Sequence, residues 1–133
     1  MDVLQVEAQY GLRLPRSHVL CLEDLADSIH EACDFLLLES EVELLSFVHV
    51  NEFLHRPDKW NRWPAHLVAF ASNGCGDYFA YDLRSHPLTI IYLDPSATPE
   101  EALSSSDPLT FQSFDHWRSY QLELHKRVVS SDE

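Results

Sequence analysis

Three short apolar segments separated by two tight turns constrain the fold of this chain more than any other feature. The segments are 67–72, 77–83 and 88–93, and they are rich in β-branched and aromatic residues. Between them stand Asn73-Gly74-Cys75-Gly76 and Arg84-Ser85-His86-Pro87, which are typical of turns. Connections this short join antiparallel strands, because parallel strands need a much longer crossover. We therefore predict an antiparallel β-meander in the second half of the chain.

Two helical patterns occupy the N-terminal part of the chain. Residues 1–10 can form a short helix that ends at Gly11, because glycine suits the left-handed position after a helix. Pro15 fits the first turn of a second helix. The apolar face of this second helix would carry residues at steps of three and four, namely Val19, Leu22, Ala26, Ile29 and Cys33.

The segment between the second helix and the meander combines short apolar runs with a third helix. Residues 35–38 form a candidate buried strand, and residues 41–45 could add another. Ser46 can cap a helix that ends before Pro57. Its predicted buried residues are Phe47, Val50 and Leu54.

A last helical pattern follows the meander. Segment 94–108 is polar, contains three prolines and is predicted to be a surface loop. Ser113 can then cap a helix, and residues 130–133 are expected to be a frayed tail. The predicted buried face of this helix is Phe114, Trp117, Tyr120, Leu124 and Val128. This order predicts a single α+β domain over residues 1–133, with an antiparallel meander sheet packed against N-terminal and C-terminal helices.

The charge of the chain is strongly negative and unevenly placed. The sequence has 22 Asp and Glu against 9 Lys and Arg, so its formal net charge is −13. Segment 23–43 contains eight carboxylates and no Lys or Arg: Glu23, Asp24, Asp27, Glu31, Asp34, Glu39, Glu41 and Glu43. Such a surface repels nucleic acid and attracts basic proteins, although acidity can also serve solubility alone. We therefore expect a protein partner and no nucleic-acid partner.

Catalytic and metal-binding patterns are weak in this sequence. The eight histidines form neither an HExxH motif nor a zinc-finger spacing, and the three glycines form no phosphate-binding loop. We therefore expect no metal site and no cofactor. Cys75, between two glycines, is the best candidate nucleophile, but the carboxylate of Asp77 would raise the pKa of its thiol. A small thiol hydrolase is accordingly the least favoured reading.

Targeting and membrane signals are not visible. No stretch approaches the roughly 20 apolar residues of a membrane-spanning helix. The N-terminus, Met1-Asp2-Val3-Leu4, lacks the basic start and apolar core of a signal peptide. These observations favour a cytoplasmic protein with no membrane partner.

Four short motifs occur in the order typical of a known family. They are Glu7 with Tyr10-Gly11-Leu12-Arg13-Leu14-Pro15, the Ser46-capped segment to Asn51, residues 67–83 with Gly76-Asp77, and Ser113-Phe114 with Trp117. With these motifs the chain resembles the SUKH superfamily, which includes fungal regulators of cell-wall synthesis and many bacterial immunity proteins. The family often has an Asn-Gly-Gly turn soon after its second helix, whereas residues 23–31 of this chain are predicted to continue the helix.

The resemblance implies a structural role for most of the motif residues. Gly76 permits a positive φ at a turn, and Asp77 can bond nearby backbone groups. Pro15, Phe114 and Trp117 are likewise expected to serve the helices and the core.

The resemblance also implies a function, an immunity protein without catalytic activity that binds and neutralises a cognate bacterial toxin. A basic nuclease toxin would suit the acidic surface. The predicted partner-binding residues are the carboxylates Glu23, Asp27, Glu31, Asp34 and Glu39, with Trp60, Trp63 and Tyr78 as possible anchors. The alternative is a regulatory scaffold that binds other proteins and has no toxin partner.

Overall fold

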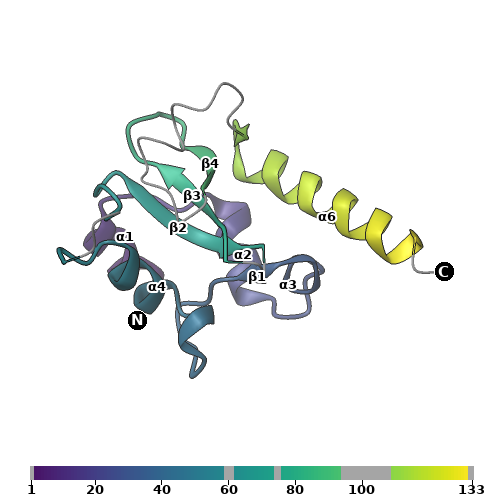
Figure 1. Cartoon of the computed structure of the whole chain (residues 1–133), viewed down its shortest axis with the longest axis horizontal. Helices are drawn as coiled ribbons and strands as arrows, with labels where there is room; N and C mark the ends of the chain where they lie inside the picture. The colour runs from purple at the N-terminus through teal and green to yellow at the C-terminus, as the bar shows by residue number, and fades with distance from the viewer. Residues whose placement is uncertain (1, 59–61, 74–75, 94–108, 132–133) are drawn as a thin grey trace.

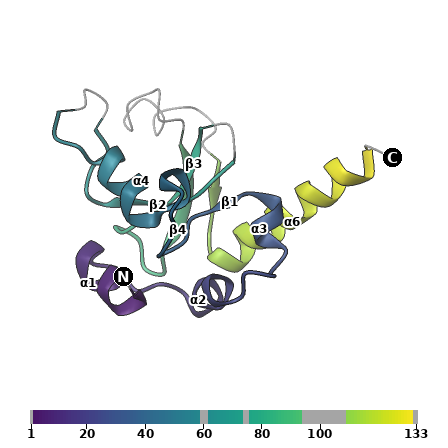
Figure 2. The ribbon, with the colours of Figure 1, turned by 90° about the horizontal axis from the view of Figure 1, so that it is seen from below.

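The computed structural model describes residues 2–58, 62–73, 76–93 and 109–131. Trp60, Cys75 and the predicted loop 94–108 therefore lie outside the described residues. Helices from the N-terminal half of the chain and a long C-terminal helix pack around a β-sheet (Figures 1 and 2). The arrangement confirms the prediction of an α+β domain.

Across the described ranges, the sheet is a five-stranded antiparallel meander in sequence order. Its strands are β1 (Asp34–Phe35), β2 (Leu67–Ser72), β3 (Tyr78–Asp82), β4 (Thr89–Leu93) and β5 (Thr110–Phe111). The three central strands confirm the prediction, whereas β5 was not predicted. β2 is buried along its whole length, as expected for a central strand covered on both faces.

The first helix follows its sequence signals closely. α1 (Val3–Tyr10) begins with Asp2 and Gln5, which bond each other's backbone N–H groups in a capping box. It ends at Gly11, whose φ of 69° is the left-handed conformation that glycine adopts without strain. Pro15 occupies the N-cap of the next helix, one residue earlier than predicted.

The prediction of one long second helix is wrong. The chain forms α2 (Arg16–Glu23), turns over residues 24–28, and forms the single helical turn α3 (Ile29–Ala32). Asp24 Oδ1 accepts the N–H of Ala26, at 3.0 Å, and Asp27 Oδ1 accepts the N–H of Ile29, at 2.9 Å. Aspartate side chains thus compete with the helix for backbone N–H groups. The chain therefore turns after α2, where more helix was predicted, without using glycine.

Two further predictions in the next segment need correction. The candidate strand 35–38 contributes only Phe35 to β1, and Leu37 then forms an isolated parallel bridge with Ser46. Residues 41–45 do not form a strand, because Glu43–Leu45 is the 3-10 helix η1.

The third predicted helix is confirmed as α4 (Phe47–Leu54). Ser46 Oγ accepts the N–H of His49, at 3.2 Å, and caps this helix as expected. The three predicted residues, Phe47, Val50 and Leu54, are all buried.

Asn51 of α4 and His55, the residue that caps the C-terminus of this helix, cover the edge of β2 where β1 has ended. Asn51 Nδ2 donates to the C=O of Ala69, at 2.8 Å, and Asn51 Oδ1 accepts the N–H of the same residue, at 2.8 Å. His55 Nε2 lies 2.7 Å from the C=O of Leu67. Asn51 is fully buried, so these bonds supply the partners that a longer β1 would otherwise provide.

The last helix, α6 (Phe114–Ser131), packs on the sheet only through its first half. Phe114, Trp117 and Gln121 are buried, whereas Tyr120, Leu124 and Val128 are 40%, 41% and 53% exposed. The predicted buried face is therefore wrong beyond Trp117, because the second half of the helix extends past the sheet (Figures 1 and 2). The helix also includes Ser130 and Ser131, so the frayed tail was predicted to begin too early.

Aromatic rings fill the core between α6, α2 and the sheet. Phe70 stacks on Tyr81 with ring centroids 4.5 Å apart, and Trp117 meets Phe70 edge-on at 4.8 Å. His18, from α2, stacks on Phe114 at 4.9 Å and is fully buried. This core fixes α2 and α6 against the sheet and so positions the surface segments between α2 and α4.

Candidate protein-binding surface

The five carboxylates predicted to bind a partner do not share one helix face. Glu23 ends α2, Glu31 lies in α3, Asp34 in β1 and Glu39 in the segment after β1. These four side chains are exposed. The acidic surface therefore extends over several elements around residues 23–43.

Asp27 differs from the other four carboxylates because it is paired within the fold. Arg118, from α6, donates from one guanidinium nitrogen to both oxygens of Asp27, at 2.9 and 3.0 Å. Partial burial works to raise the pKa of Asp27, but the N–H of Ile29 and the Arg118 guanidinium outweigh it and hold this pKa below its usual value. Asp27 thus links the turn before α3 to α6, and its carboxylate is paired with Arg118 within the fold.

This ion pair leads to a stability prediction. The Arg118→Gln variant should lose about 1–2 kcal/mol of unfolding free energy at pH 7, because it leaves a partly buried carboxylate unpaired. The double variant Asp27→Asn, Arg118→Gln should lose less than the sum of the two single variants. Urea unfolding of all four proteins measures the coupling, and additive losses would contradict the pairing.

Of the three predicted aromatic anchors, the structure describes two. Trp63 is only 1% exposed, so it packs in the core and cannot act as a surface anchor as predicted. Its ring meets Tyr78 edge-on, with centroids 6.2 Å apart. Tyr78 is half-buried and leaves part of its ring on the surface. Trp63 also meets the ring of His55 edge-on, with centroids 6.4 Å apart, so it is a packing residue.

An apolar groove lies at one end of the acidic surface, and sequence reasoning missed it. We call it the leucine groove, with a volume of about 330 Å³. It is lined by Asp2, Val3, Leu22, Glu23, Leu25, Leu37, Leu38 and Glu39. The turn after α2 forms this site, because a continuous helix would have placed Leu25 elsewhere. Two predicted binding residues, Glu23 and Glu39, meet at this groove.

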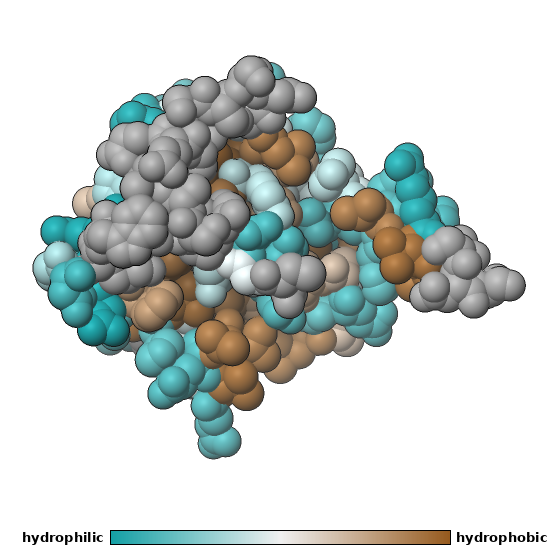
Figure 3. All heavy atoms as spheres, in the orientation of Figure 1, coloured by the Kyte–Doolittle hydropathy of each residue, from teal (hydrophilic) through white to brown (hydrophobic). Residues whose placement is uncertain are grey.

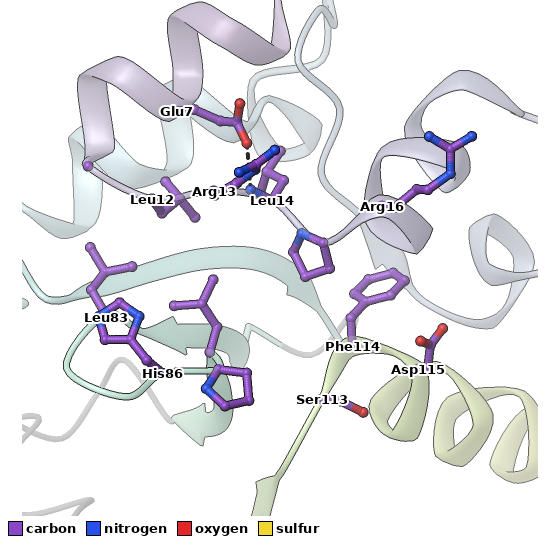
Figure 4. A pocket seen from close by; sticks show the side chains of 14 residues that line it. Glu7, Leu12, Arg13, Leu14, Arg16, Leu83, His86, Ser113, Phe114 and Asp115 are labelled. Carbon is purple, nitrogen blue, oxygen red and sulfur yellow. Dashed lines mark hydrogen bonds between the residues drawn. The ribbon is translucent and has the colours of Figure 1, made fainter.

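A larger hollow of about 720 Å³ lies beside three of the family motifs (Figure 4). Glu7 Oε2 accepts the N–H of Leu14, at 2.7 Å, and so fixes the link between α1 and α2. Phe114 and Pro15 line the hollow together with Arg13, Arg16, Asp115 and the turn between β3 and β4. Its described lining mixes both charges, so it favours neither basic nor acidic partners.

The Gly76-Asp77 motif forms a hydrogen-bonded turn. Gly76 has a φ of 97°, as its predicted structural role requires. The Asp77 N–H donates to Asn73 Oδ1, at 3.2 Å, and the Asp77 carboxylate accepts the hydroxyl of Tyr92. The two residues therefore join β2, β3 and β4 at one end of the sheet, which is a structural role.

The described thiols and histidines do not form a catalytic arrangement. Burial raises the pKa of Cys33 to about 12 and also raises the pKa of Cys21, so both thiols stay protonated at neutral pH. Within the described ranges, no three His, Cys, Asp or Glu side chains gather closely enough to hold a metal ion. No helix among the same residues has the length and apolar character needed to cross a membrane.

The fold and motifs define a small α+β domain whose motif residues serve mainly to hold helices on a meander sheet. The chain belongs to the SMI1 / KNR4 family (SUKH-1), whose family model matches residues 1–118. Searches of the curated proteins and of the solved structures found no significant match. The match ends at Arg118, so the projecting half of α6 lies beyond it.

Proposed function

We propose that this protein is an immunity protein, which binds a cognate bacterial toxin through its acidic surface and neutralises it without catalysis. Membership of the SUKH-1 family is consistent with this function and with a regulatory one. The observation that favours a basic partner is the segment from residue 17 to residue 55, which contains no Lys or Arg. The exposed carboxylates of this segment create a local negative field that attracts a basic protein.

The test uses the toxin gene expected directly upstream of this gene. Co-expression of the wild-type protein should restore growth of cells that produce the toxin. Growth inhibition that persists with well-expressed, folded protein would contradict the proposal, and so would the absence of any toxin gene at that place. Binding without protection would favour the regulatory alternative.

Charge reversal locates the surface. The triple variant Glu31→Lys, Asp34→Lys, Glu39→Lys should slow association with the toxin at least tenfold at low salt, because it removes electrostatic attraction. The difference should shrink as salt screens exposed charges. Stopped-flow or surface-plasmon measurements at several salt concentrations give the rates.

A second triple variant controls for net charge. Asp58→Lys, Asp115→Lys, Glu123→Lys changes three exposed carboxylates outside segment 17–55 and shifts the net charge equally. Equal slowing by both triple variants would show that total charge, and not this surface, governs association.

A further inference from the structure

The leucine groove combines an apolar floor with an acidic rim. Val3 of α1, Leu22 of α2 and Leu38 are partly buried and pack against the core. Leu25, at the turn after α2, is 66% exposed. The volume of about 330 Å³ is at the lower end of the range for small-molecule pockets, about 300–1,000 Å³. Such a space suits a few aliphatic side chains of a partner.

The charges at the rim select the chemistry of that partner. Asp2, Glu23 and Glu39 line the groove and are exposed. A segment that placed aliphatic side chains in the groove would therefore gain from Lys or Arg beside them, whereas carboxylates there would be repelled.

The same combination continues on the neighbouring turn. The N–H of Leu37 donates to the C=O of Leu45, at 2.8 Å, so η1 lies next to the groove. On this turn Val42 and Leu44 are 54% and 73% exposed. Glu41 and Glu43 are exposed beside them. Figure 3 shows hydrophobic atoms next to hydrophilic ones at the lower edge of the molecule, where Figure 1 draws this turn.

We propose that the leucine groove and η1 together bind an amphipathic segment of the partner, which presents aliphatic side chains flanked by Lys or Arg. The inference rests on the proposed function and names the docking face for the toxin. Clustered apolar side chains supply the contact area, and the carboxylates between them supply specificity for a basic segment.

A model peptide tests this docking face on the full chain. The probe is a 14-residue peptide of leucine and lysine only, with the leucines at helical spacing along one face. We expect it to bind at least tenfold more tightly than a peptide of the same composition with a shuffled order, which has no apolar face. The Leu25→Ser variant should weaken binding about fivefold or more, and the double variant Glu23→Gln, Glu39→Gln should reduce its salt dependence.

Leu124→Ser is the matched control, because Leu124 is also an exposed leucine but lies on α6 outside the groove. Equal binding of the ordered and shuffled peptides would overturn the inference, as would equal weakening by Leu25→Ser and Leu124→Ser.

The toxin assay separates the two proposals. If wild-type protein and Leu25→Ser neutralise the toxin equally well, the leucine groove is not the docking face, and the proposed immunity function stands. If the wild type does not neutralise the toxin, the proposed immunity function is wrong, and the peptide titration still measures whether the leucine groove binds an amphipathic basic segment.

Discussion

Replacing Asn51 by leucine is expected to lower the free energy of unfolding by about 3–5 kcal/mol, the largest effect of any single polar substitution proposed for this chain. Leucine has a similar size, so the change removes hydrogen bonds without leaving a large cavity. The N–H and C=O of Ala69, buried in β2, would each lose their partner in the Asn51 amide. A buried backbone group without a partner costs about 1–3 kcal/mol. Guanidinium unfolding at pH 7 measures the loss.

The neighbouring Glu52 provides the control for this prediction. Glu52 is exposed on the same helix, so Glu52→Gln should change the unfolding free energy by less than about 0.5 kcal/mol. An Asn51→Leu protein as stable as the Glu52→Gln protein would show that the hydrogen bonds between Asn51 and Ala69 contribute little to the stability of the fold.

The second large effect is a loss of stability in mild acid caused by His18. Its Nδ1 lies 2.6 Å from the hydroxyl of Tyr81, and its Nε2 has no hydrogen-bond partner among the residues that the structure describes. Complete burial lowers the pKa of His18 to about 3, against about 6.5 in the unfolded chain. Below about pH 6.5, His18 therefore binds a proton in the unfolded state but not in the folded state. The free energy of unfolding falls as the pH drops below this value. With about 1.4 kcal/mol per pH unit, the loss from His18 alone between pH 7 and pH 5 is about 2 kcal/mol.

The His18→Phe variant isolates this contribution. It should be less stable than the wild type at pH 7, by about 1–2 kcal/mol, because the buried Tyr81 hydroxyl loses its partner. Its stability should fall about 2 kcal/mol less between pH 7 and pH 5 than that of the wild type, because His18 no longer binds a proton in the unfolded chain. Denaturant unfolding at both pH values gives the comparison. An unchanged acid loss in His18→Phe would assign it to other groups, such as His66, whose pKa burial also lowers.

The central part of the fold could be predicted because its signals are local. Tight turns fix antiparallel pairing of β2, β3 and β4, and Ser46 marks the start of α4 by capping it. The break after α2 could not be read from apolar periodicity, because Asp24 and Asp27 end the helix through their own side-chain hydrogen bonds. The exposed apolar residues of α6 were misassigned for a different reason, since the pattern does not show where the sheet ends.

The candidate surface was predicted by charge but not by shape. The acidic stretch is visible in the sequence, yet the pairing of Asp27 with Arg118 joins residues 91 positions apart. The burial of Trp63 and the meeting of Leu22, Leu25 and Leu38 at one groove also depend on the tertiary fold. These features need the structure, because no local pattern encodes them.

The way in which α4 covers β2 also limits how other chains can approach the sheet. β1 is two residues long, and the amide of Asn51 and the ring of His55 occupy backbone groups of β2 beyond it. An intruding strand would have to displace α4 before it could pair there. This side of the sheet is therefore protected against edge-to-edge aggregation, and any ligand that reaches it must recognise side chains rather than extend the sheet.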